Sequence, residues 1–211
     1  MPTNRKPSEK EREATRKKLL AAEAVFLLLL LRASRQRNRK AAVAQAILQG
    51  SLPIRRLARE RLAAELRMRF GPSSSTFTRD ARQRAATVAA RFSDFVGQQR
   101  VQLAGVPAGQ SEQALRRQTE NAVQNRLRQI ATTESVRAFE EERREALDEL
   151  GDEMPEGTTK VWDALMDACE VCSQYDGREI ALDDEFPEGD PPLHPNCRCS
   201  LEYRLGTKGA T

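Results

Sequence analysis

The sequence predicts a mainly α protein, in which an extended helical N-terminal part is followed by a small α+β module with a short antiparallel sheet. Three observations lead to this prediction. Apolar residues recur every three or four positions over most of the first 150 residues, this spacing disappears after Gly151, and the four cysteines and the single histidine all lie between residues 169 and 199. We therefore expect a basic helical region followed by a Cys/His module at 151–205.

The first predicted helix begins at Ser8, which has the spacing of a capping box with Glu11. It extends for up to about 40 residues, because no Gly or Pro occurs before Gly50, and Gly50 and Pro53 are expected to end it. From 19 to 31 the helix is apolar on every side, which is typical of a buried helix. A protein–protein contact and a membrane-active segment are the alternatives to core packing.

Further helices are expected along the rest of this part. One spans 53–70, and another spans 77–103 with its phenylalanines in the core. Breakers at 105–109 precede a helix capped by Ser111, whose apolar pattern weakens at 132–135, so that the chain either bends or restarts there. Gly151 is expected to supply the C-cap.

Charge separates the two parts of the chain. Residues 151–211 contain 5 basic and 14 acidic residues, a net charge of −9, whereas the first 150 residues contain 30 basic and 17 acidic ones, a net charge of +13. Cations are concentrated directly after the apolar run. A solvated helix face explains them most simply, but such a cluster also suits DNA phosphates or an acidic protein surface. The cluster consists of Arg32, Arg35, Arg37, Arg39 and Lys40.

A membrane span is not expected. The mean hydropathy is −0.65, and the longest apolar run, Val25 to Leu31, has seven residues. A spanning helix needs about 20 apolar residues. The charged residues before this run and the arginines after it argue against a secretory signal, so we expect the chain to stay in the cytoplasm where it is made.

The acidic part is predicted to contain strands at 159–166, 178–182 and 199–205, with Asp176-Gly177 as a turn signal. About 60 residues with one Trp can bury little apolar surface, so a metal or disulfide staple is expected. The two parts share no obvious apolar stripe. We therefore expect the module to unfold separately from the helices.

Two short Cys/His segments, the first ligand turn at Cys169–Cys172 and the second at His194–Cys199, supply this staple. Each can present two ligands to a tetrahedral structural Zn²⁺ site, and 24 residues lie between Cys172 and Cys197. Four of five candidates would bind, with Cys169 and Cys172 joined by His194 and Cys197, His194 and Cys199, or Cys197 and Cys199. Two disulfides and unpaired core cysteines are the alternatives.

A site closed by four protein ligands has no open position for water, so we do not expect an enzyme. A catalytic interpretation must release a ligand, with His194 as a general base beside Asp167 or Asp190 in a metal-dependent nuclease. A zinc-containing DNA-binding protein is a further alternative. In that case the zinc module would be expected on the basic side of the chain, whereas it lies on the acidic side.

Five motifs stand out between residues 130 and 199. They are Ile130-Ala-Thr-Thr-Glu134-Ser, Lys160-Val-Trp162, Asp167-Ala-Cys169-Glu-Val-Cys172, Asp176-Gly177 and Pro191-Pro192-Leu-His194-Pro195-Asn-Cys197-Arg198-Cys199. With these motifs the region from about 127 to 202 resembles the C-terminal domain of phage Mu F-like head morphogenesis proteins, also called minor capsid or minor head proteins, and the last motif makes the resemblance specific. The resemblance implies a basic helical region at 1–125 and a second domain at 126–211.

The resemblance implies a virion component of a tailed phage that acts in head assembly, in few copies near the portal. Expected partners are the portal protein, the major capsid protein, or both, and non-specific contact with packaged DNA or its end is a further implication. Thr132-Thr133-Glu134 matches the family's helix-opening pattern. In that role Thr132 or Thr133 would cap the helix and Glu134 would favour its positive start.

Overall fold

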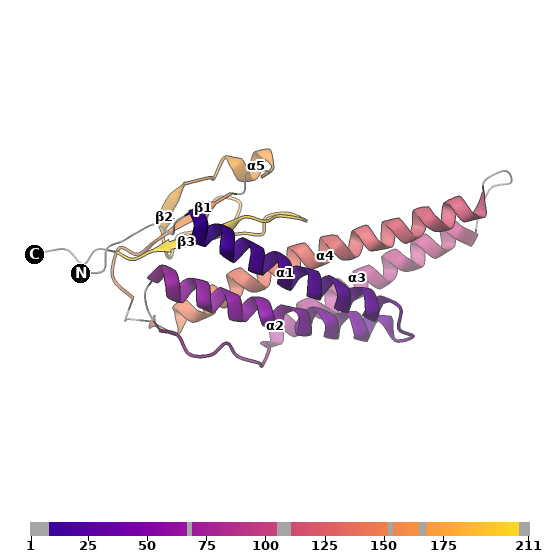
Figure 1. Cartoon of the computed structure of the whole chain (residues 1–211), viewed down its shortest axis with the longest axis horizontal. Coiled ribbons are helices and arrows are strands. Elements are labelled where there is room, and N and C mark those ends of the chain that lie inside the picture. The colour runs from indigo at the N-terminus through magenta and orange to yellow at the C-terminus, as the bar shows by residue number, and fades with distance from the viewer. Residues whose placement is uncertain (1–8, 67–68, 105–110, 152–153, 165–167, 207–211) are drawn as a thin grey trace, which may run out of the picture.

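The computed structural model describes residues 9–66, 69–104, 111–151, 154–164 and 168–206. Within these ranges four long helices and a small three-stranded sheet confirm the predicted fold class (Figure 1). Ser8, the breakers at 105–109, the end of the first predicted strand and Asp167 lie outside the described residues. The elements are α1 (Glu9–Ser34), α2 (Arg39–Leu66), α3 (Arg79–Ala104), α4 (Glu112–Asp148), β1 (Thr159–Asp163), α5 (Glu170–Ser173), β2 (Glu179–Ala181) and β3 (Ser200–Arg204).

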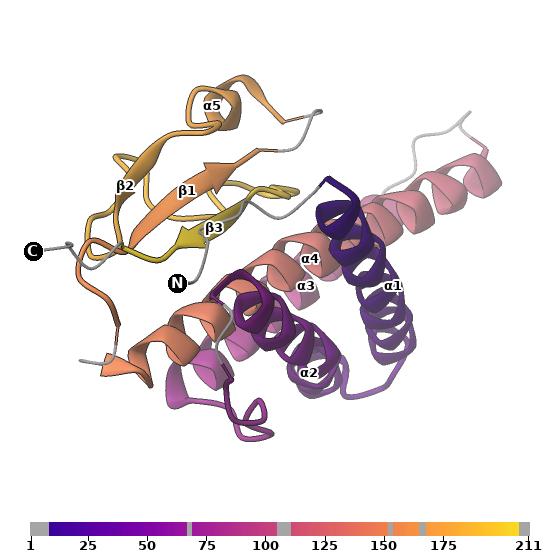
Figure 2. The ribbon, with the colours of Figure 1, turned by 60° about the vertical axis from the view of Figure 1, so that its left-hand side comes forward.

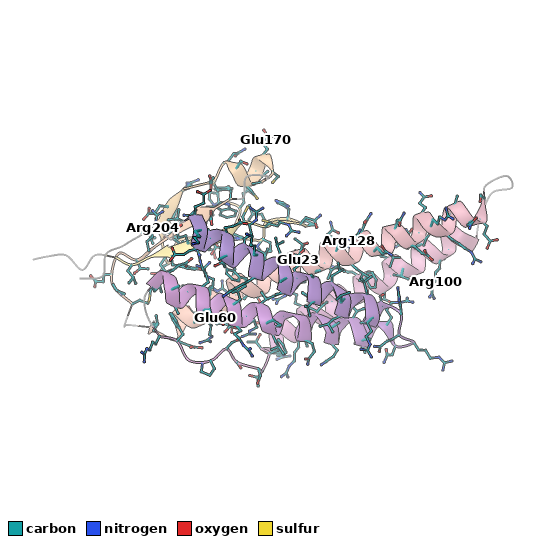
Figure 3. The ribbon with its side chains drawn as sticks, in the orientation of Figure 1. Glu23, Glu60, Arg100, Arg128, Glu170 and Arg204 are labelled. Atoms are coloured by element: carbon teal, nitrogen blue, oxygen red, sulfur yellow. The ribbon has the colours of Figure 1, made fainter. Side chains whose placement is uncertain are left out.

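The helices form a bundle in which α2 lies against α1, α3 and α4, while α1 also packs on α4. The sheet has the order β2-β1-β3, and both strand pairs are antiparallel. Strand β3 contacts α2 and α4, so the sheet lies against one end of the bundle (Figure 2). At the opposite end α3 and α4 extend beyond the other helices (Figure 1), and Arg100 is labelled on this part of α3 in Figure 3.

Helix α2 runs through Gly50 and Pro53, so the prediction that these residues end a helix was wrong. The chain instead turns at 35–38, between α1 and α2. A Cβ at Gly50 would overlap the Phe26 ring, so this glycine allows α1 to approach α2 closely. Pro53 is solvent-exposed, and Ile54, one position later, is fully buried. Tertiary packing therefore offsets the unfavourable proline, which costs about 3 kcal/mol inside a helix.

Only one side of the apolar run in α1 lies in the core. Phe26 and Leu30 have no exposed surface, but Val25 is 52% exposed and Leu28 is 65% exposed. The prediction of core packing therefore holds for one face of α1. The opposite face is apolar and solvent-exposed.

The cap predicted for α4 is confirmed, because the Ser111 side chain accepts a hydrogen bond from the Ala114 N–H. The helix neither bends nor restarts at 132–135 but continues to Asp148. Thr132 and Glu134 are therefore buried in the middle of a helix, and the interpretation of this motif as a helix start was wrong. At the other end the C-cap is Glu149, and Gly151, with φ of 46°, follows two residues later.

Charged side chains fill part of the contact between α2 and α4. Glu142 is fully buried and accepts hydrogen bonds from both Arg55 and Arg59. These arginines also reach outward, to Glu145 at 2.6 Å and to Glu149 at 2.5 Å. The buried charges are thus paired, as a low-dielectric environment requires.

The sheet and the bundle share a hydrophobic core, which contradicts the expectation that the two parts have no common apolar surface. Leu62 and Leu66 of α2 and Leu147 of α4 belong to the same buried cluster as Trp162 and Phe186 of the module. The Trp162 ring meets the Phe186 ring edge-on, with 5.1 Å between their centroids. The module is therefore packed on the bundle rather than attached to it by a linker alone.

Among the described helices, none combines the length and the apolar character needed to cross a bilayer.

Candidate metal centre

The first ligand turn is built on the short helix α5. Cys169 is its N-cap residue with extended backbone (φ −68°, ψ 165°), and Cys172 lies one turn later. The Ser173 N–H and hydroxyl both donate to the Cys169 carbonyl, at 2.9 and 3.0 Å. These bonds hold the two cysteine side chains on the same side of the turn.

The second ligand turn connects His194 to the start of β3. The Cys197 N–H donates to the His194 carbonyl at 3.1 Å, and Asn196 between them adopts a positive φ of 64°. Asn and Asp are the residues other than Gly that tolerate this conformation most readily. The Asn196 N–H donates to the Thr133 hydroxyl at 3.1 Å, which anchors the turn to the middle of α4.

All five predicted ligands gather in one place. Their ligand atoms form two overlapping groups, within each of which all atoms lie within 4.8 Å of one another. One group contains Cys169, Cys172 and His194, the other contains Cys172, Cys197 and Cys199, and Cys172 is therefore common to both. The four cysteines are free rather than bridged.

The spacing within the cluster fits tetrahedral coordination. The Cys172 and Cys197 sulfurs are 3.9 Å apart, and His194 Nε2 lies 3.1 Å from the Cys169 sulfur and 3.2 Å from the Cys172 sulfur. Around Zn²⁺ with Zn–S bonds of about 2.3 Å and a Zn–N bond of about 2.0 Å, sulfurs are about 3.8 Å apart and a nitrogen lies about 3.6 Å from each sulfur. The cluster needs to expand only slightly on the histidine side to meet these values.

The histidine is oriented with the correct nitrogen toward the sulfurs. His194 Nδ1 lies 2.9 Å from the Pro195 carbonyl oxygen, which can only accept, so Nδ1 carries the proton. In the neutral ring Nε2 then offers its lone pair to the cluster. Metal-bound histidines commonly use such a backbone carbonyl to fix their tautomer.

The cysteines of the cluster shift one another's thiol pKa values in opposite directions. A hydrogen bond from Cys199 lowers the pKa of the Cys197 thiol to about 5, while the same contact and burial raise the pKa of Cys199. Burial raises the pKa of Cys172 to about 12, and a hydrogen bond from the Cys172 backbone lowers that of Cys169. A bound dication would favour the thiolate form of each ligand and reverse the two upward shifts.

Of the two acids predicted beside His194 in a nuclease, Asp167 lies outside the described residues and Asp190 accepts from the buried Lys160 ammonium at 2.8 Å. His194 Nε2 faces two sulfurs. Within the described residues, His194 has no hydrogen bond to a carboxylate.

The predicted cation cluster lies at the corner between α1 and α2. Arg32, Arg35, Arg37 and Lys40 are exposed. Arg39 is half-buried and donates to the Ser34 carbonyl at 2.7 Å, so it holds the corner together. Burial and the nearby Arg100 of α3 lower the pKa of Arg39. Arg100 is therefore a further cation near the cluster, which the linear sequence did not indicate.

Other residues that support the centre were not predicted. Glu23 of α1 accepts from Arg198, at 3.1 Å to each carboxylate oxygen, and from the Thr132 hydroxyl at 2.7 Å. Since Arg198 lies between two candidate ligands, this contact ties the second ligand turn to α1. The only sequence signal was Glu23 itself, a lone acid in an apolar run.

The fold and the site define a class of protein in which a helical bundle carries a small module whose Cys and His side chains could hold a metal ion. More specifically, the chain belongs to the family described as Phage Mu protein F like protein, whose model matches residues 38–202. This confirms the family predicted from the motifs, and the match begins far upstream of them, at the end of the α1–α2 corner. Family membership associates the chain with phage head morphogenesis. No curated protein and no solved structure matches it.

Proposed function

We propose that the chain is a structural minor capsid protein of a tailed phage. It acts in head assembly near the portal and becomes part of the virion, in the head interior or at the portal vertex, after assembly in the host cytoplasm. The observation that carries this proposal is the family match over 38–202, a range that includes most of the bundle and the whole Cys/His cluster. The portal protein, the major capsid protein and packaged DNA are the proposed partners.

The proposed cofactor is a structural Zn²⁺ held by four of Cys169, Cys172, His194, Cys197 and Cys199. Thiolate and imidazole ligands at tetrahedral spacing support zinc. Closed coordination leaves no position for water, so the proposed role of the metal is to stabilise the module and the loop from Pro191 to Cys199. The protein acts through its surfaces and not as an enzyme.

The exposed cations at the α1–α2 corner support a contact with DNA phosphates or with an acidic portal surface. They lie at the end of α1 remote from the sheet, so the module and this corner are available to different partners (Figure 1). A zinc-containing DNA-binding protein is the weaker alternative, because the Cys/His module is the acidic part of the chain.

Quantitative mass spectrometry of purified heads tests the proposal. We expect the chain in mature particles, in few copies relative to the major capsid protein, and at a much lower level when Cys172→Ser replaces the wild type. Its absence from wild-type particles would exclude the role. In parallel, purified full-length protein is incubated with DNA and Mg²⁺, Mn²⁺ or Zn²⁺. Cleavage that disappears with His194→Ala would favour the nuclease.

A further inference from the structure

The outward face of α1 carries an apolar stripe that no described element covers. Leu20, Val25 and Leu28 are 44%, 52% and 65% exposed, and Ala21 and Ala24 between them are exposed as well. Figure 2 shows α1 at the edge of the bundle, where its opposite side meets α2 and α4. Exposed large apolar side chains that cluster on one face of a helix indicate a contact site.

Cations bracket the stripe at both ends. Arg16, Lys17 and Lys18 precede it, Arg32 and Arg35 follow it, and all five are exposed. The pairs of Lys17 with Glu13 (3.4 Å) and of Lys18 with Glu60 (3.9 Å) are solvent-exposed and therefore weak. Within the described residues, the Arg32 and Arg35 side chains form no ion pair.

This charge pattern indicates which kind of partner can bind the apolar stripe of α1. In an antiparallel pairing with a second copy, Lys17 would lie against Arg32, and in a parallel pairing Lys17 would lie against Lys17. Either arrangement opposes like charges at both ends, which is unfavourable. A partner with acidic residues at both ends of an apolar stretch complements the face in either direction.

The shape of the stripe favours a helix as this partner. Leu20, Ala24 and Leu28 follow one another at intervals of four residues and form a ridge of the kind that packs into the groove of a second helix. The small side chains of Ala21 and Ala24 allow a close approach. From Leu20 to Leu28 the stripe is about 12 Å long, at about 1.5 Å per residue, so a helix of two to three turns covers it and one further turn at each end reaches the cations.

We propose that the outward face of α1 is a docking site for an amphipathic helix of another head protein, with apolar residues on one side and acidic residues at both ends. The inference specifies the chemistry of the partner helix. That the partner is a head protein rests on the proposed function. Residues 1–37 precede the family match, so the surface lies in a part of the chain that the family model does not cover.

Binding of two synthetic peptides to the full-length protein tests the proposal. Both peptides are about 18 residues long, with Leu at positions i, i+3, i+4 and i+7. One carries Glu in its first and last turns, and the other carries Lys there. We expect the Glu-ended peptide to bind at least about tenfold more tightly at low salt, with the difference shrinking as salt screens the charges.

Two exposed variants locate the binding. Leu28→Gln should weaken the Glu-ended peptide at least about tenfold, because it removes the most exposed apolar side chain of the stripe. The matched control is Val101→Gln on α3, which is 73% exposed and should leave binding unchanged. Lys17→Glu combined with Arg32→Glu should shrink the preference for the Glu-ended peptide, because two of the five flanking cations become acids.

Three results would overturn the inference. The first is equal binding of the two peptides, and the second is a Leu28→Gln variant that binds normally. The third is a different occupant of the stripe: the protein dimerises in sedimentation, or binds anionic phospholipid vesicles, and Leu28→Gln abolishes that dimerisation or vesicle binding.

The peptide assay does not need phage particles, so the two proposals can fail separately. If the chain occurs in heads but binds neither peptide, only this inference is refuted. If it binds the peptides as expected but is absent from heads, only the proposed function is refuted.

Discussion

Replacing Arg143 should destabilise the bundle and the module together. Its side chain is 1% exposed, donates to the Leu201 carbonyl of β3 and to Glu65 of α2, and lies 3.5 Å from Glu140. The guanidinium also lies 4.6 Å from the Tyr203 ring centroid. One side chain of α4 therefore joins α2 and the sheet.

The expected magnitude follows from what Arg143→Met leaves behind. Glu65 keeps its partner Arg61 at 2.5 Å, whereas Glu140 keeps, among the described residues, only the Leu201 N–H. Removing one partner of a buried ion pair costs about 3–5 kcal/mol, out of a total stability of about 5–15 kcal/mol. At a typical slope of about 2 kcal/mol per molar, a loss of about 4 kcal/mol shifts the urea midpoint by about 2 M.

Urea unfolding can be measured by far-ultraviolet ellipticity, which reports on the helices, and by fluorescence of Trp162, the single tryptophan, which reports on the sheet. Because the helices and the sheet share a core, the ellipticity and fluorescence transitions should coincide and shift together. The control is Arg116→Met, the same substitution in an exposed pair with Glu112, which should cost less than about 1 kcal/mol. Above pH 7, where Glu140 ionises, adding Glu140→Gln to Arg143→Met should restore part of the loss, since it removes the unpaired charge. A shift of Arg143→Met no larger than that of Arg116→Met would refute the reasoning.

Three further predictions concern metal, pH and DNA. Protein purified without chelator should contain about one zinc per chain by elemental analysis, and Cys172→Ser should remove the zinc and lower the midpoint of both optical signals. Burial raises the pKa of Glu140 from 4.5 to about 7, so its contribution to stability is fully present below about pH 4.5 and is lost as the pH rises through about 7. Stability relative to Glu140→Gln should therefore fall by about 3 kcal/mol across that window in paired unfolding titrations, and a constant difference would contradict the assignment. Changing Arg32, Arg35 and Arg37 to Gln should lower the slope of log DNA affinity against log salt by up to about 3 in fluorescence anisotropy, whereas an unchanged slope would mean that they face protein.

The helices and strands were predictable where local periodicity and packing agree. The positions of β1, β2 and β3 follow from short apolar runs, and the ligand cluster follows from two turns of known spacing. Sequence reasoning could not choose four of the five ligands, because the choice depends on where the two turns meet. In the structure Cys172 lies between the other candidates, a result of tertiary packing alone.

The course of α2 was not predictable, since the residues that override its breakers are far away in sequence. From the sequence alone, Gly50 indicates a helix end. The structure shows that Phe26 packs on Gly50, so the glycine serves close helix packing instead. The sequence from Glu140 to Glu145 contains only charged residues, a composition typical of a solvated face. Yet Glu140, Glu142 and Arg143 are buried, because α2 and β3 supply their partners.

Part of the charge contrast between the two parts is satisfied inside the molecule. Arg12 of α1 pairs with Asp163 and Glu202 of the sheet, at 3.3 and 2.6 Å, and Glu23 pairs with Arg198 in the opposite sense. Segment net charge therefore overstates what is offered to a partner, because cations already paired with a carboxylate release few counterions on binding DNA. The exposed cations that can still contact a partner include those at the α1–α2 corner and at the ends of the α1 stripe. Since both groups border the same helix, contact with DNA or a portal and docking of an acidic helix would compete for Arg32 and Arg35.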